Sequence, residues 1–281
     1  MIENEILIGD CLEKIGELDN KSIQACITSP PYAQQRKNLY SGVGEADYPE
    51  WTNKWMEALK PKLTDDGSVL IAIRTNVKNG AISPYVLKTR LLLMENGWKE
   101  CEELLWLKSD APPLGSMQRP RRIWEHILWY SQSKSPYIDL YACGTLSGRK
   151  GFAGSTRFGS EIHGGVNTDF PQSGVSRISD IFVANVGDIE RGIMHPAMFP
   201  GSLSDQLVVT FSRKNDMVLD VFSGSGTTCC SAKKLERRFV GIELNKDYAA
   251  ASRTRLEGVR TETHNPVQAE RFVPGVGFFI E

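Results

Sequence analysis

One stretch restricts the possible folds more than any other. Residues 217–222 are apolar enough to predict a strand, residues 223–226 spell Ser-Gly-Ser-Gly, and residues 227–238 have helical spacing. Residues 239–244 then predict the next strand. Such a strand–turn–helix–strand unit builds parallel sheet, and its turn glycines lie at the strand's carboxyl end, where open α/β sheets bind ligands. We therefore expect an α/β protein with a ligand site at this turn.

The residues around this turn indicate which ligand it holds. Glu243 follows Asp220 at roughly 20 residues, a distance at which an acid commonly accepts hydrogen bonds from ribose hydroxyls. A phosphate-binding Walker loop needs Gly-Lys-Ser/Thr, whereas Thr227 follows Gly226, and the dinucleotide fingerprint needs a third glycine where Cys229 stands. The turn therefore suits an adenosyl ligand without phosphate, such as S-adenosylmethionine. Asp220 would orient the turn or the ammonium group.

Strand and helix patterns alternate along much of the remaining chain. We expect strands at residues 5–9, 23–27, 68–73, 98–108 and 123–131, and helices after Asp10, at 49–63, at 83–96 and around Leu203, Leu207, Val208 and Phe211. Leu12, Ile15 and Leu18 should form the buried face of the first helix, Trp51 and Trp55 should be core, and residues 65–67 should form a turn. Asp10 is expected to be a helix N-cap or a ligand contact, and it can be both at the carboxyl end of a strand. This alternation predicts a sheet covered on both faces.

Composition excludes several classes of protein. The chain has 281 residues, of which 41% are hydrophobic, enough for one large domain or two small ones. Its net charge is −1, so nucleic-acid contacts must come from local basic clusters. Six cysteines without a CxxC pair, and four scattered histidines, argue against a zinc site or a disulfide framework. The cysteine and histidine pattern thus predicts no metal. The chain carries no long apolar run, so we expect no membrane span, and its N-terminus does not resemble a signal peptide. We therefore expect a reducing cytoplasm as its compartment.

A second unusual stretch is TSPPY, residues 28–32, directly after the strand expected at 23–27. Two consecutive prolines hold the chain extended and cannot donate hydrogen bonds, so they form a rigid rim. The Ser29 hydroxyl and the Pro30 carbonyl are acceptors, and Tyr32 offers a flat ring. Such a rim suits a grip on the exocyclic amine of a planar base, with the aromatic ring stacked on its face. The alternative is a Pro-Pro turn with a surface tyrosine.

Basic residues gather in segments with weak periodicity. Residues 33–48 form a long polar stretch, residues 118–122 hold three arginines, and residues 140–160 contain no acid. These segments are either flexible surface insertions or a recognition region that grips phosphates and reaches base edges. The candidate DNA contacts are Arg36, Lys37, Arg119, Arg121, Arg122, Arg149, Lys150 and Arg157.

Together, TSPPY (28–32) and DVFSGSGTT (220–228) resemble the amino-group DNA methyltransferases in their beta-group order, with the catalytic motif before the cofactor motif. Further segments similar to motifs of that family are residues 9–11, 59–68, 106–108, 195–200 and 239–244, in the same order. Two positions depart from the pattern. Val221 stands where the family usually has proline, and Ser29 stands where adenine-modifying members usually have Asp or Asn. The SPPY form is similar to that of the cytosine-N4 enzymes.

This resemblance implies a Rossmann-like mixed sheet with helices on both faces and a small inserted recognition region. It divides the chain into a catalytic half (1–134), a target-recognition region (135–190) and a cofactor-binding half (191–281). The catalytic residues would be Ser29, Pro30, Pro31 and Tyr32. The cofactor, S-adenosyl-L-methionine, would contact Asp10, Cys11, Thr28, Phe199, Asp220, Phe222, Gly224, Ser225, Gly226, Thr227, Thr228, Glu243 and Leu244.

The implied function is site-specific methylation of the N4 amine of a flipped cytosine in double-stranded DNA, in a restriction-modification system. The protein would be a monomer or a weak homodimer, and a cognate restriction endonuclease is a candidate partner. Adenine-N6 methylation by the same group is the alternative. Competitors from other classes are a non-catalytic DNA-binding module and an NAD-dependent oxidoreductase. Intact Ser29 to Tyr32 and Glu243 argue against the first, and the missing third glycine argues against the second.

Overall fold

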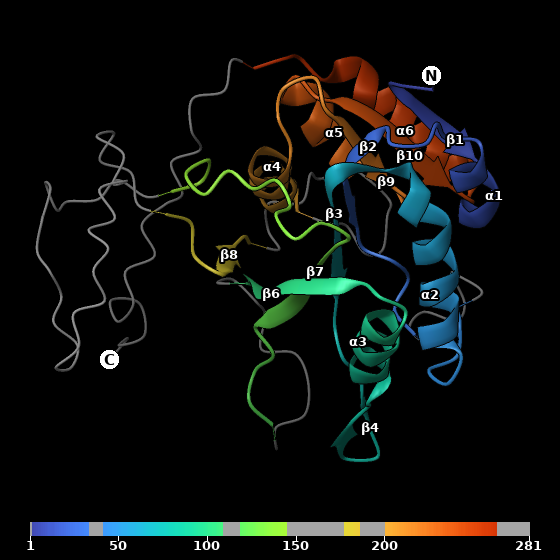
Figure 1. Ribbon diagram of the computed structural model, residues 1–281, viewed down its shortest axis with the longest axis vertical. Coiled ribbons are helices and arrows are strands. Elements are labelled where there is room, and N and C mark those ends of the chain that lie inside the picture. Colours follow the sequence, from blue (N-terminus) through green and yellow to red (C-terminus); the bar gives the residue numbers. More distant parts are fainter. Residues whose placement is uncertain (1, 34–41, 109–118, 145–176, 186–199, 263–281) are drawn as a thin grey trace, which may run out of the picture.

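The protein is organised around an eight-stranded mixed sheet (Figure 1). The computed structural model describes residues 2–33, 42–108, 119–144, 177–185 and 200–262. In spatial order the strands are β1 (Glu5–Ile8), β10 (Arg238–Glu243), β9 (Met217–Asp220), β2 (Ile23–Thr28), β3 (Leu63–Ile73), β7 (Trp124–Ser131), β6 (Lys99–Leu107) and β8 (Ile181–Val183). Within this sheet β7 runs antiparallel to both neighbours, and every other pairing is parallel. A short hairpin, β4 (Val77–Lys78) and β5 (Ala81–Ile82), lies outside it.

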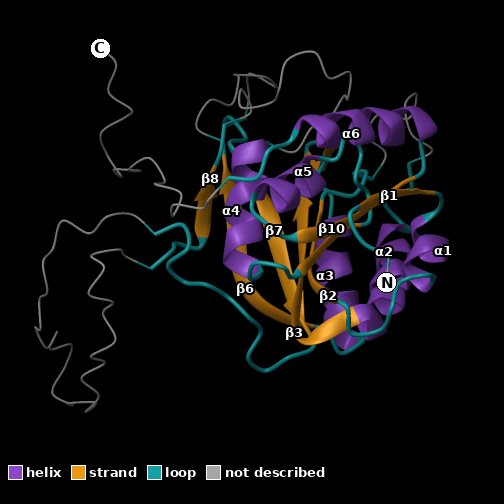
Figure 2. Cartoon of the chain, turned by 90° about the horizontal axis from the view of Figure 1, so that it is seen from above, coloured by secondary structure: helices purple, strands orange, loops and turns teal. Residues whose placement is uncertain are grey.

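Helices cover both faces of the sheet, as predicted (Figure 2). One face packs against α1 (Cys11–Gly16), α2 (Tyr48–Leu59) and α3 (Tyr85–Glu95), and the other against α4 (Gly201–Phe211), α5 (Thr227–Lys234) and α6 (Lys246–Gly258). A single 3-10 turn, Lys60–Lys62, follows α2. Alternate strand residues enter opposite layers; Ile71 packs on the α2 side and Leu70 on the α4 side. Burial of both faces explains why these strands are continuous apolar runs.

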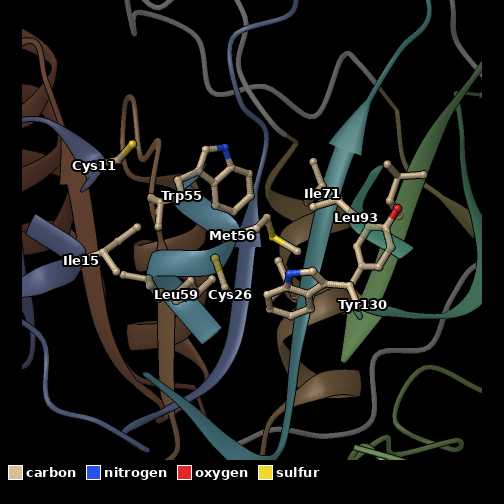
Figure 3. Packing of buried hydrophobic residues seen from close by; sticks show 14 of the residues in the cluster. Cys11, Ile15, Cys26, Trp55, Met56, Leu59, Ile71, Leu93 and Tyr130 are labelled. Atoms are coloured by element: carbon tan, nitrogen blue, oxygen red, sulfur yellow. The ribbon is translucent and has the colours of Figure 1, made fainter. Parts of the chain in front are cut away.

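The core beneath α2 fixes this helix on the sheet (Figure 3). Trp55, Met56 and Leu59 are each 0% exposed and pack with Ile15 of α1 and Cys26 of β2. Full burial of a side chain of this size stabilises the fold by about 1.5–3 kcal/mol relative to its exposure. Trp55 is therefore a core residue, as predicted.

Three local predictions were wrong. Leu12 is 39% exposed, because Cys11, Ile15 and Leu18 share the buried face at helical spacing. The helix expected at 227–238 ends at Lys234, and Glu236 then takes a positive φ of 64°, which cannot continue a helix. The remaining correction concerns β3.

Residues 65–67 do not form a separate turn but lie within β3. The pairing register with β2 shifts there, from Ile23 opposite Leu63 to Ala25 opposite Ser68. The extra residues on β3 make an irregularity of the bulge kind. A Cβ at Gly67 would lie 3.0 Å from the Ile23 carbonyl oxygen, so this close approach of two backbones favours glycine.

Parts of the expected recognition region belong to the core of the sheet. Ala142 and Cys143 are buried on the α4 side, and Phe182 of β8 and Ala184 join them. The division of the chain at 134 and 190 stays a prediction, and residues 145–176 lie outside the described part. Among the described helices, none is long and apolar enough to cross a membrane. In the same part of the chain, no group of three or more His, Cys, Asp or Glu side chains could hold a metal ion.

Candidate active site

Two stretches far apart in sequence meet at the centre of the sheet. Strands β2 and β9 are parallel neighbours, with Cys26 opposite Leu219, so their carboxyl ends lie at the same edge. There the Thr28 hydroxyl donates to Asp220 Oδ1 at 2.7 Å, although the two residues are 192 positions apart. Both side chains are buried. TSPPY and the glycine turn therefore lie side by side at one edge of the sheet, as a common site requires.

The glycine turn after β9 is closed by its own backbone. Asp220 Oδ1 also accepts from the Phe222 amide at 3.1 Å, and the Gly226 amide donates to the Ser223 carbonyl at 2.7 Å. Gly224 and Gly226 have φ of 51° and 79°, in the left-handed region that favours glycine. A Cβ on Gly226 would lie 2.0 Å from the Ser252 hydroxyl of α6. The second glycine thus serves close helix packing as well as the turn.

Glu243 holds the turn from the neighbouring strand. One carboxylate oxygen accepts from the Gly224 amide and the other from the Asn245 amide, both at 2.8 Å. Burial raises the pKa of Glu243, and these two amides oppose the shift. Each oxygen has a second lone pair, so the side chain can still accept hydrogen bonds from a pair of hydroxyls. The adjacent Leu244 side chain is 67% exposed.

Asp220 is the second acid at this edge. Burial raises its pKa from an ordinary 3.8 to about 6, against hydrogen bonds from Thr28, Thr228 and the Phe222 amide. The charge of Glu243 raises the pKa of Asp220 further. Two buried acids beside one turn favour a cationic or hydroxyl-bearing ligand.

The loop after β1 borders the same edge. The Gly9 amide donates to the Glu243 carbonyl at 3.0 Å, which places this loop beside the end of β10. Asp10 is the N-cap of α1 and accepts from the Leu12 amide at 2.9 Å, which confirms the N-cap, while ligand contact by Asp10 stays a prediction. Burial raises the pKa of the Cys11 thiol to about 12, which keeps it neutral. Cys11 is therefore not a nucleophile, and its predicted contact with the cofactor stays a prediction.

The remaining features of the turn fit an adenosyl ligand. The Ser223 hydroxyl is buried with no hydrogen-bond partner within the described chain, which leaves it free to bind a ligand. Phe222 lies beside two indole rings, with centroids 5.3 Å from Trp51 and 5.7 Å from Trp55. An acid for hydroxyls, an unused hydroxyl and an aromatic wall are the groups that an uncharged nucleoside needs. Phe199, also predicted to contact cofactor, lies outside the described residues.

Three predicted cofactor residues also bind other parts of the protein. Arg255 of α6 donates to the Ser225 carbonyl at 2.7 Å and to the Thr227 hydroxyl at 3.3 Å. The Thr228 hydroxyl donates to the Ile27 carbonyl at 3.4 Å, which ties α5 to β2. Their side chains thus support the turn, and ligand contact by them stays a prediction.

The predicted catalytic motif, residues 28–32, lies next to this turn and has an anchor that the sequence did not predict. Pro30 is buried, and Ser29, Pro31 and Tyr32 are half-buried. The Tyr32 hydroxyl donates to Glu125 Oε2 at 2.5 Å. Glu125 is a lone acid within the apolar stretch at 123–131, and that contrast was the available signal for it.

The predicted DNA contacts are only partly described. Arg119 and Arg121 are exposed, and Arg119 donates to the Gly80 carbonyl. Arg122 is half-buried and donates to both the carbonyl and the hydroxyl of Thr75, at 2.6 and 2.7 Å. Arg122 therefore supports the loop after β3. Arg36, Lys37, Arg149, Lys150 and Arg157 lie outside the described residues.

Comparison with known sequences identifies the relatives of this chain. A family model described as DNA methylase, for N6 and N4 enzymes, matches residues 23–254. The type II methyltransferase M.PvuII of Proteus hauseri is 26% identical over 278 residues, covering 89% of this chain and 82% of that protein. The type II methyltransferase M.BglII of Bacillus subtilis is 25% identical, covering 93% of this chain and 71% of its own.

Comparison with solved structures supports the fold. The PvuII DNA methyltransferase, described as cytosine-N4-specific, superposes with a TM-score of 0.69 at 22% identity, covering 89% of this chain and 85% of the other. The complex of M1.HpyAVI with SAM gives a TM-score of 0.59 at 21% identity, covering 90% and 98%. The Rossmann-like architecture expected from the sequence is thereby confirmed.

Proposed function

This chain belongs to the N6/N4 DNA methylase family, and from that premise we propose that it methylates the exocyclic N4 amine of cytosine in double-stranded DNA. At family level it is a DNA methyltransferase that uses S-adenosyl-L-methionine. The observation that carries the proposal is the Thr28–Asp220 hydrogen bond of 2.7 Å, which joins the amine grip to the adenosyl turn at one edge of the sheet.

The cofactor side of the site follows from the donors and acceptors described above. S-adenosyl-L-methionine, when bound, supplies an electrophilic methyl group. Glu243 would accept the ribose hydroxyls on the lone pairs that its two backbone partners leave open. Asp220 would orient the turn or accept from the ammonium group, and Ser223 offers its unused hydroxyl.

The base side uses position and electrostatics rather than covalent catalysis. In this proposal the Ser29 hydroxyl and the Pro30 carbonyl accept the two amine hydrogens, which directs the nitrogen lone pair out of the ring plane. Stacking on Tyr32 returns about 1–3 kcal/mol of the few kcal/mol that base flipping costs. Burial keeps the thiols of Cys11 and Cys26 protonated, so neither serves as a nucleophile.

The choice of cytosine over adenine rests on two supports. Ser29 stands where adenine-modifying members of the resembled group usually have Asp or Asn, and one structure with a similar fold is described as cytosine-N4-specific. Adenine-N6 methylation is the alternative, since serine and aspartate both accept a hydrogen bond from an exocyclic amine.

The relatives also point to a biological setting. M.PvuII and M.BglII are type II methyltransferases, so we place this protein in a restriction-modification system in the cytoplasm, with a cognate endonuclease acting on the same DNA site. Exposed Arg119 and Arg121 are proposed to contact the phosphate backbone.

One experiment tests the activity directly. The protein is incubated with plasmid DNA and methyl-labelled S-adenosyl-L-methionine, and the modified base and its sequence context are identified. We expect N4-methylcytosine in a single context. N6-methyladenine would replace the base assignment, and unlabelled DNA would overturn the proposal. Thermal stabilisation by S-adenosyl-L-methionine, but not by NAD, separates this function from that of an oxidoreductase.

A further inference from the structure

A buried charged pair stands behind the catalytic motif. Glu125, near the start of β7, is 4% exposed, and its side chain lies opposite Trp106 in the β6–β7 register. Lys108, just after β6, donates to Glu125 Oε1, and its side chain is only 12% exposed. The second oxygen, Oε2, accepts from the Tyr32 hydroxyl at 2.5 Å. The two oxygens thus serve two different partners.

The pair is held firmly by the sheet. The Lys108 ammonium lies 4.1 Å from the centroid of the Trp106 ring, and the Trp106 indole donates to the Ala184 carbonyl at 2.9 Å. The Lys108 amide also donates to the Ile123 carbonyl at 2.7 Å. A buried carboxylate is stable only when it is paired and hydrogen-bonded, and Lys108 meets that requirement. Glu125 is therefore a fixed acceptor.

This arrangement fixes the ring of Tyr32 at both ends. The backbone is restrained by the preceding prolines, and the hydroxyl is tied to a strand on the other side of β3. Burial and the nearby Glu125 carboxylate raise the pKa of Tyr32, so the phenol keeps its proton and remains a donor. Fixing the backbone and the hydroxyl sets the long axis of the ring, and the fixed acceptor also favours one ring plane, because a phenolic O–H prefers to lie in the plane of its ring.

We propose that Glu125 is a positioning residue for methyl transfer: together with Lys108 it holds the Tyr32 hydroxyl, so that the ring stands in its stacking plane before a base enters. This inference rests on the proposed function. Its effect is on rate, because a stacking platform ordered in advance places the amine for attack without further loss of freedom. Binding of the cofactor, which involves other residues, is not affected.

The variants Glu125→Gln and Tyr32→Phe test this role. In Glu125→Gln the amide oxygen turns toward Lys108 and an NH₂ group faces the Tyr32 hydroxyl, so the short charge-assisted bond to a carboxylate is replaced by a weaker one in which the hydroxyl can only accept. Tyr32→Phe keeps the ring face and the buried ion pair but removes the hydroxyl. We expect each change to lower kcat roughly 10- to 100-fold with an unchanged KM for S-adenosyl-L-methionine. The double variant should be no slower than Tyr32→Phe alone, because without the hydroxyl Glu125 has nothing left to position.

Glu100→Gln is the matched control. Glu100 is another carboxylate with little exposure on this sheet, on β6, paired with Arg90 at 2.8 Å and remote from Tyr32 in the strand order. It should lose stability as Glu125→Gln does, while its kcat stays at the wild-type value.

The possible outcomes distinguish failure of the proposed function from failure of the positioning role of Glu125. If wild-type protein transfers no methyl group to DNA, the proposed function falls, and this inference falls with it. If wild-type protein is active but Glu125→Gln matches Glu100→Gln in kcat, or Tyr32→Phe retains full kcat, only the positioning role is overturned. Should Glu125→Gln fail to fold, full kcat in Tyr32→Phe would still overturn the role, since this variant leaves the Glu125–Lys108 pair intact.

Discussion

The candidate site lies at the carboxyl ends of β9 and β2, called here the cofactor end and the catalytic end, and different kinds of contact hold these two ends in place. At the cofactor end, Asp220 bonds to the amide of Phe222 and Glu243 to the amides of Gly224 and Asn245, all within one strand–helix–strand unit. At the catalytic end, Tyr32 bonds to a residue 93 positions away. A local unit carries its geometry in a short motif. The catalytic end depends on how the whole sheet is assembled.

The largest expected effect is a loss of methyl transfer, with unchanged cofactor binding, when the catalytic end alone is altered. Ser29→Ala removes the proposed amine acceptor but leaves the glycine turn untouched. We expect methyl transfer to fall about 10²–10³-fold, as when a preorganised polar group is lost from an active site. Single-turnover rates with labelled cofactor measure this, and calorimetry should show unchanged cofactor affinity. Ser22→Ala, before the amino end of β2, is the control. A fully active Ser29→Ala would show that the motif lacks this role.

The next effect concerns stability and pH at the cofactor end. Burial raises the pKa of Asp220 to about 6, so the folded state holds the proton more tightly than the unfolded state. The resulting stability is fully present below pH ~4 and is lost as pH rises through ~6. Relative to Asp220→Asn, the cofactor-free wild type should thus lose roughly 2–2.5 kcal/mol of unfolding free energy between pH 4 and 7. Urea unfolding across this range checks it, and a constant difference would contradict the prediction.

A smaller effect is expected from the bond that joins the two ends. Thr28→Val keeps the shape of the side chain but removes the donor to buried Asp220, which should cost about 2 kcal/mol at pH 7. In an Asp220→Asn background the cost should be about half, because the bond is no longer charge-assisted. Thr52→Val is the control, since the Thr52 hydroxyl of α2 is buried with no partner among the described residues. Equal costs for Thr28 and Thr52 would remove the proposed connection between the ends.

The smallest expected effect is on cofactor affinity. Glu243→Gln retains one acceptor oxygen for the turn but loses the charge and one acceptor. We expect about tenfold weaker binding of S-adenosyl-L-methionine, or about 1.4 kcal/mol, with kcat restored at saturating cofactor. Isothermal calorimetry measures this, with exposed Glu257→Gln on α6 as the control. An unchanged affinity would mean that Glu243 only holds the turn.

The same contrast explains what the sequence could predict. Strands β2, β7 and β9 were expected because long apolar runs fit a sheet buried on both faces. Helix α6 was missed because small side chains such as Ala249 and Ser252 form much of its buried face, which leaves weak hydrophobic periodicity. Strand β8 has only three residues, too few for any pattern.

The residues of the candidate site also fall into a predictable and an unpredictable group. Asp220 and Glu243 were assigned from motif spacing, and the structure adds a hydrogen bond between Thr28 and Asp220. The contact between Tyr32 and Glu125 could not be predicted, because it depends on where β7 lies relative to β2. Lys108 was noted only as the end of a strand motif. Side chains that act across a sheet need the register of strands, and spacing along the chain does not supply it.

The pairing of β2 with β9 also means that the candidate site can form only late in synthesis of the chain. The ribosome makes Thr28 early and Asp220 only 192 residues later, so for most of translation β9, the strand that pairs with β2 on one side, does not yet exist. The nascent polypeptide carries its catalytic motif throughout this period without the partner that completes it. Enzyme activity therefore begins only once the last strands have been synthesised.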